Sequence, residues 1–105
     1  MRDVLALPAD LGTAGWEPVD QGRAIAKTYS FDSFPEAMAF MLRVSYDAEK
    51  ADHHPEWSNV YNRVDVRMTT HDAGGLTEKD FTLARAMEGA ASVLLKKPTP
   101  GRSEP

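Results

Sequence analysis

Two hairpin patterns, each followed by a helix-start signal, most limit how this chain can fold. The first is predicted over 16–31 around a turn-like 20–22, and the second over 57–70 with its turn at 62–63. In both, large apolar residues alternate with small or polar ones, which is typical of a strand with one buried face. The alternating apolar residues are Ile25, Tyr29 and Phe31, then Val64, Val66 and Met68.

A capping box follows each hairpin. Ser33-Phe34-Pro35-Glu36 predicts a helix that continues to Lys50, and Pro55 predicts its end near 52–54 because a residue before proline disfavours helix. Thr77-Glu78-Lys79-Asp80 predicts a second long helix. The stripes expected to face the core are Phe34, Ala37, Met38, Met41, Val44, Ser45 and Ala48 in the first helix, and Leu83, Ala84, Met87, Ala90, Ala91 and Leu94 in the second.

This order, β-β-α-β-β-α after a short N-terminal helical lead-in, predicts an α+β fold. We expect a four-stranded antiparallel sheet with both long helices packed on one face. The chain has 105 residues, which favours one domain over 1–97, followed by a disordered tail over 98–105. Because so small a domain leaves much surface exposed, we also expect a homodimer or homotetramer.

Composition excludes several classes of site. The chain has no cysteine, which rules out disulfides, thiolate catalysis and cysteine-based metal sites. With 16 acidic and 12 basic residues it has no basic field, so we expect neither direct nucleic-acid binding nor attraction to anionic membranes. No apolar run has the length of a membrane span or signal peptide, so a cytoplasmic location is expected.

All three histidines, His53, His54 and His71, lie within nineteen residues. Imidazoles exchange protons near neutral pH, so the cluster indicates general acid–base chemistry. Two alternatives stay open. One histidine could simply interact with the helix C-terminus, or the three could bind a metal, although adjacent residues seldom point at one ion.

The spacing Glu49-x3-His53-His54-Pro55-x5-Tyr61-x9-His71-x8-Asp80 resembles the signature of the pterin-4a-carbinolamine dehydratases. That family also includes the dimerisation cofactor of a homeodomain transcription factor. The similarity covers about 15–95 and is densest over 49–80. It implies dehydration of 4a-hydroxytetrahydropterin to quinonoid dihydropterin, without metal or organic cofactor. The alternative is a non-enzymatic protein-interaction module on the same fold, although retention of all three histidines favours the enzyme.

The resemblance also implies the site. The catalytic residues would be His53, His54 and His71, with His54 and His71 handling the two protons and His53 binding or orienting the pterin. The other implied contacts with the substrate or the histidines are Glu49, Pro55, Trp57, Thr70, Asp72, Ala73 and Asp80.

Several of these residues have a structural alternative. Asp80 also completes a capping box, and Glu49 could be an ordinary solvated residue near a helix end. Trp57 and Tyr61 share strand parity and could belong to the core rather than stack on a pterin. Asp72 stands where many family members have glutamate, which shortens the reach of its carboxylate.

Overall fold

A computed structural model describes residues 5–95 of the chain, without the side chain of residue 95. The predicted disordered tail lies outside the described residues, as does the end of the predicted domain. The elements are α1 (Ala9–Thr13), β1 (Glu17–Val19), β2 (Ala24–Ser30), α2 (Phe34–Ala51), β3 (Glu56–Val60), β4 (Arg63–Met68), the 3-10 turn η1 (His71–Ala73) and α3 (Glu78–Leu95).

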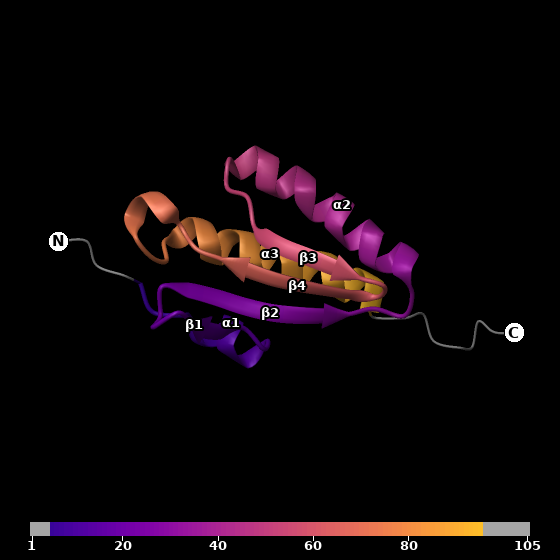
Figure 1. Cartoon of the computed structure of the whole chain (residues 1–105), viewed down its shortest axis with the longest axis horizontal. Helices are drawn as coiled ribbons and strands as arrows, with labels where there is room; N and C mark the ends of the chain where they lie inside the picture. The colour runs from indigo at the N-terminus through magenta and orange to yellow at the C-terminus, as the bar shows by residue number, and fades with distance from the viewer. Residues whose placement is uncertain (1–4, 96–105) are drawn as a thin grey trace, which may run out of the picture.

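The four strands form one antiparallel sheet in the order β1-β2-β4-β3 (Figure 1). In the central pair, Ile25 lies opposite Met68 and Tyr29 opposite Val64. These four side chains are buried, as the alternation predicted. The predicted α+β fold is therefore confirmed.

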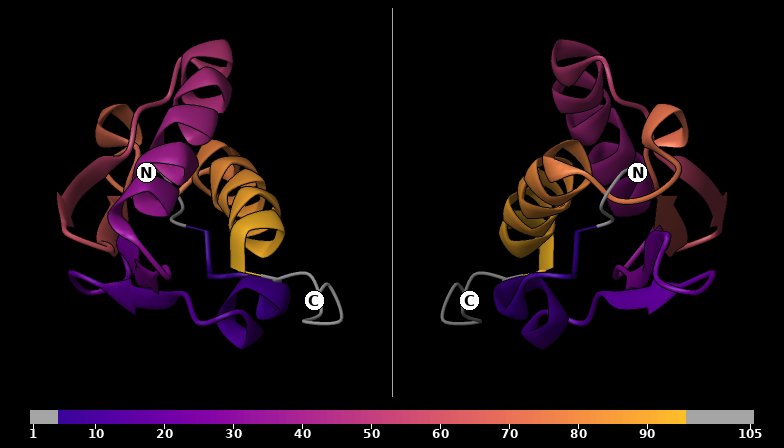
Figure 2. Two further views of the ribbon diagram at one scale, coloured as in Figure 1. Left: turned by 90° about the vertical axis from the view of Figure 1, so that its right-hand side faces the viewer. Right: turned by 90° about the vertical axis from the view of Figure 1, so that its left-hand side faces the viewer.

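Helices α2 and α3 both lie on one side of the sheet (Figure 2). Between them and the strands is a single core, in which Phe40 of α2 packs against Tyr29 and Phe31 at centroid distances of 4.8 and 5.1 Å. The stripe predicted for α3 is confirmed, since its members are buried or packed against the core.

The stripe predicted for α2 was partly wrong. Phe34, Met38 and Ser45 are exposed, whereas Phe40, which the sequence pattern did not assign to the core, is fully buried. Each residue advances about 100° around a helix, so the apolar residues of α2 form two neighbouring stripes. Packing against the sheet buries the stripe that contains Phe40 and leaves the other exposed.

A carboxylate of α3, that of Glu88, binds Trp16, which precedes β1, and two residues of β2. Oε2 of Glu88 accepts hydrogen bonds from Trp16 Nε1 (3.0 Å), Lys27 Nζ (2.6 Å) and Tyr29 Oη (2.5 Å). Burial, and then the hydrogen bond to Glu88, raise the pKa of the Tyr29 hydroxyl. Tyr29 therefore stays a neutral donor, and the cluster holds the first strands under α3.

The C-terminal end of α2 determines where His53 lies. Ser33 caps the helix start by accepting from the Glu36 amide at 3.4 Å. At the other end Asp52 adopts the left-handed conformation (φ 52°), and the His53 amide donates to the Ala48 carbonyl at 3.0 Å. This closure folds His53 back beneath the last turn of α2.

The second hairpin turns one residue earlier than predicted. Tyr61 and Asn62 form the turn, with Tyr61 at φ 53°, while Arg63 already belongs to β4 and pairs with Val60. The Asn59 side-chain amide donates to the carbonyls of Tyr61 (3.0 Å) and Arg63 (2.8 Å), which closes the tight turn. Beyond β4, the chain forms η1 and a bridge between Thr70 and Gly75.

Candidate active site

The end of α2, the end of β4 and the start of α3 meet around one cavity of about 370 Å³. All three histidines contribute to its wall. A cavity of this size lies within the range of small-molecule sites. The lining residues are Asp52, His53, His54, Thr69, Thr70, His71, Asp72 and Lys79.

His53 is the buried histidine of the site. Its Nε2 lies 2.6 Å from Oδ1 of Asp80, whose side chain is fully buried. The other oxygen of Asp80 accepts from the Thr77 amide (2.9 Å) and the Thr70 hydroxyl (2.8 Å). One oxygen of Asp80 therefore binds the start of α3, as in a capping box, and the other contacts the imidazole of His53.

His54 is exposed and lies beside the last turn of α2. Its Nε2 is 3.0 Å from Oε1 of Glu49, which is itself exposed. The contact joins two residues of the motif that begins at Glu49 and ends at Asp80. Its exposure leaves the imidazole open to solvent and to a ligand in the cavity.

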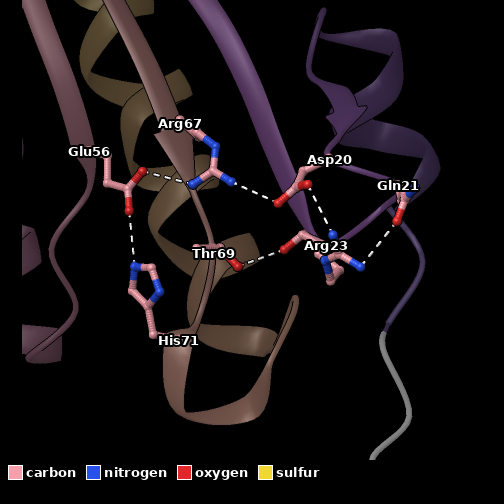
Figure 3. A network of polar contacts seen from close by, with 7 residues as sticks. All are labelled: Asp20, Gln21, Arg23, Glu56, Arg67, Thr69 and His71. Carbon is pink, nitrogen blue, oxygen red and sulfur yellow. Dashed lines mark hydrogen bonds and ion pairs between the residues drawn. The ribbon is translucent and has the colours of Figure 1, made fainter.

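His71 lies at the start of η1. Its Nε2 is 3.0 Å from Oε2 of Glu56, and Nη1 of Arg67 donates to Oε1 of the same carboxylate at 2.7 Å (Figure 3). The hydrogen bond to His71, and then that to Arg67, hold the pKa of the Glu56 carboxyl below its usual range. Glu56 is therefore ionised at neutral pH and can only accept.

The structure brings together most of the residues singled out from the sequence. Five line the cavity, and Glu49 and Asp80 each contact one of its histidines. Pro55, Trp57 and Ala73 lie outside the lining. Trp57 is half-buried and packs against Phe40 at a centroid distance of 6.5 Å, so in this structure it belongs with the core, while Tyr61 is an exposed turn residue.

Sequence reasoning missed Lys79 and Thr69 in the cavity wall and Arg67 beside Glu56. The carboxylates of Asp52 and Glu56 flank the first two histidines in the sequence, and the structure places Asp52 in the cavity wall and Glu56 beside His71. Glu56 and Arg67 face each other across β3 and β4, so strand register could have paired them. Lys79 follows the Thr77 cap, and only the packing of α3 against the loop after α2 brings it to the histidines.

Within residues 5–95, no three histidine, aspartate or glutamate side chains are grouped so that they could hold a metal ion. Nor does that part of the chain contain a helix with the length and apolar character needed to cross a membrane.

The sequence profile of the family described as pterin 4 alpha carbinolamine dehydratase matches residues 3–90. The chain belongs to this family. A provisionally named pterin-4-alpha-carbinolamine dehydratase of Rhizobium etli is 56% identical over 92 residues, which is 87% of this chain and 91% of the relative. Another from Rhodopseudomonas palustris is 55% identical over 80 residues, or 76% and 79% of the two chains.

Two solved structures share the fold. A transcriptional coactivator/pterin dehydratase from Brucella melitensis superposes with a TM-score of 0.74 at 42% identity, covering 83% of this chain and 99% of that one. A pterin dehydratase-like protein described as a RuBisCO assembly factor of the alpha-carboxysome superposes with a TM-score of 0.65 at 18% identity, covering 73% and 89%. The second likeness concerns the fold alone.

Proposed function

We propose that this chain is a 4a-hydroxytetrahydrobiopterin dehydratase, which returns the pterin cofactor of aromatic amino acid hydroxylases to use. In the reaction the bond between C4a and its hydroxyl oxygen breaks, and the oxygen leaves as water after gaining a proton. N5 loses its proton, and its electron pair forms the C4a–N5 double bond of the quinonoid dihydropterin. One proton is given and one is taken, so the reaction needs one acid and one base and no redox partner.

The observation that carries this proposal is the shared cavity of His53, His54 and His71. Two exposed imidazoles, on different elements, could face a flat bicyclic ring from two directions. Each has a carboxylate partner, Glu49 or Glu56, that can orient it.

Burial supports different roles for the three histidines. His53 has one ring nitrogen committed to Asp80 and little exposed surface, which suits binding and orienting the pterin. His54 and His71 are exposed and can exchange protons with both water and substrate. We therefore assign the two proton transfers to His54 and His71. The proposal also includes a cytoplasmic location.

The decisive experiment measures the dehydration of synthetic 4a-hydroxytetrahydropterin by the wild type and by the His54→Ala and His71→Ala variants. We expect each variant to lose at least about tenfold in rate, or about 1.4 kcal/mol of transition-state stabilisation. A chelator should leave the wild-type rate unchanged. A wild type no faster than the uncatalysed reaction would overturn the proposal, and a chelator-sensitive rate would contradict its metal-free chemistry.

A protein-interaction role is the second candidate, and an exposed apolar stripe on α2 supports it. Phe34, Met38, Leu42 and Tyr46 follow one another at intervals of four residues, and all are exposed. Such a continuous stripe is typical of a helix that binds a partner. We propose a second copy of this chain as that partner, because a small domain gains most from burying such a surface.

Light scattering after size-exclusion chromatography tests the stripe. We expect an oligomeric wild type and a smaller particle for Leu42→Glu, because the new charge would be buried at the interface. Val93→Glu is the matched control: Val93 is 76% exposed, compared with 61% for Leu42, but lies on α3. A monomeric wild type, or equal dissociation by both variants, would contradict this assignment.

A further inference from the structure

His71 is the last member of a series of four hydrogen-bonded side chains that joins three parts of the sheet. Nε2 of His71 contacts Glu56 at the start of β3, and Glu56 accepts from Nη1 of Arg67 in β4. Nη2 of Arg67 donates to Oδ2 of Asp20, in the turn between β1 and β2, at 3.0 Å (Figure 3). One guanidinium group therefore holds two carboxylates in fixed positions.

The three residues behind His71 in this series are held by the strand register and by a further arginine. Glu56 and Arg67 are directly opposite in the β3–β4 ladder, so the strand register fixes their separation. Asp20 has a positive φ of 54°, and its second oxygen accepts from Nη2 of Arg23 at 3.1 Å. The sheet therefore places Glu56 opposite Arg67, and the bond to Arg67 holds the carboxylate that faces His71.

The contribution of these contacts to stability must be small. The side chain of His71 is 77% exposed and that of Glu56 is 47% exposed, and solvent screens such pairs. What the contacts can determine is the orientation of the ring and the position of its proton. Because an ionised carboxylate has no proton to donate, Nε2 of His71 must be the donor in this pair. A neutral ring then leaves Nδ1 as its free acceptor.

We propose that Glu56 is a positioning residue for His71, which keeps the proton on Nε2 and thereby makes Nδ1 the nitrogen that exchanges a proton with the pterin. Figure 3 shows Nδ1 on the side of the ring away from Glu56. Arg67 and Asp20 support this function by fixing the carboxylate. The inference rests on the proposed dehydratase function, but its structural half can be measured without any substrate.

A double-mutant cycle tests whether Glu56 acts through His71. In the wild-type background we expect Glu56→Gln to lower kcat at least about fivefold with KM changed less than about twofold, because a misplaced imidazole transfers protons poorly. In the His71→Ala background the same change should alter the rate less than about twofold. Asp65→Asn is the matched control: this carboxylate of β4 also bonds an arginine, Arg63, but contacts none of the three histidines.

Nitrogen NMR of the three imidazoles supplies the readout that is independent of activity. At a pH where the ring is neutral, His71 of the wild type should be almost entirely in the Nε2–H form. In Glu56→Ala it should relax toward the mixture of a histidine in water, while His54 and His53 stay unchanged. An inactive wild type with these NMR results would reject the dehydratase and keep the positioning. Equal His71 spectra in both proteins, or equal rate losses in both backgrounds, would overturn the positioning itself.

Discussion

Two of the three histidine–carboxylate pairs of the site lie in opposite surroundings. His53 and Asp80 lie 2.6 Å apart with side chains that are 10% and 0% exposed. His71 and Glu56 lie 3.0 Å apart at 77% and 47% exposure. The buried pair also binds two elements of the fold through Thr70 and Thr77, whereas the exposed pair joins only side chains at the sheet surface.

This difference indicates that the buried pair stabilises the site, whereas the exposed pair can take part in the reaction. A buried carboxylate that loses a partner cannot replace it with water, so its contacts carry a large share of local stability. An exposed carboxylate can exchange its partner for water at little cost. We therefore expect changes at Asp80 to act on folding, and changes at Glu56 to act on the rate.

The largest effect is expected from Asp80→Ala. The change leaves the His53 ring nitrogen, the Thr70 hydroxyl and the Thr77 amide without their acceptor in a buried place. We expect the free energy of unfolding to fall by about 3 kcal/mol. Urea denaturation, with a check that the slope m is unchanged, measures it.

A graded control makes this prediction sharper. Thr70→Val keeps the shape of the side chain and removes one donor from Asp80, so it should cost only about 1 kcal/mol. Asp65→Ala, at an exposed carboxylate, should stay within about 0.5 kcal/mol of the wild type. If Asp80→Ala lowered the free energy of unfolding no more than Asp65→Ala, the buried His53–Asp80 pair would not stabilise the site in the way we expect.

Most of the fold could be predicted because its signals are local. Alternation in Ile25, Tyr29 and Phe31, and the capping residues Ser33 and Thr77, fix elements over a few residues each. The buried face of α2 could not be predicted in this way. Two apolar stripes compete on that helix, and only its packing on the sheet decides that Phe40 is inside and Phe34 outside.

The part of the site that belongs to one sequence motif could be predicted. The part that depends on which residues pair across β3 and β4 could not. The histidines and Asp80 stand at fixed spacings in the sequence, and the structure brings them together. Glu56 stands two residues after His54, so the sequence places a carboxylate near the histidines but does not show which imidazole it contacts. Its function depends on β3 pairing with β4 so that Glu56 meets Arg67, which is a property of the sheet.

The smallest effect expected is the acid dependence of Glu56. Because its pKa is lowered in the folded protein, the stabilisation is complete above the unfolded value of about 4.3 and is lost as the pH falls through the folded value. Glu56→Gln should therefore be less stable than the wild type near neutral pH, by no more than about 0.5 kcal/mol for so exposed a pair. The two proteins should converge once the pH lies below that folded value. Thermal unfolding between neutral and acid pH measures the difference, which high salt should reduce. A difference of several kcal/mol, or one that grows on acidification, would show that the exposed pair resembles the buried one after all.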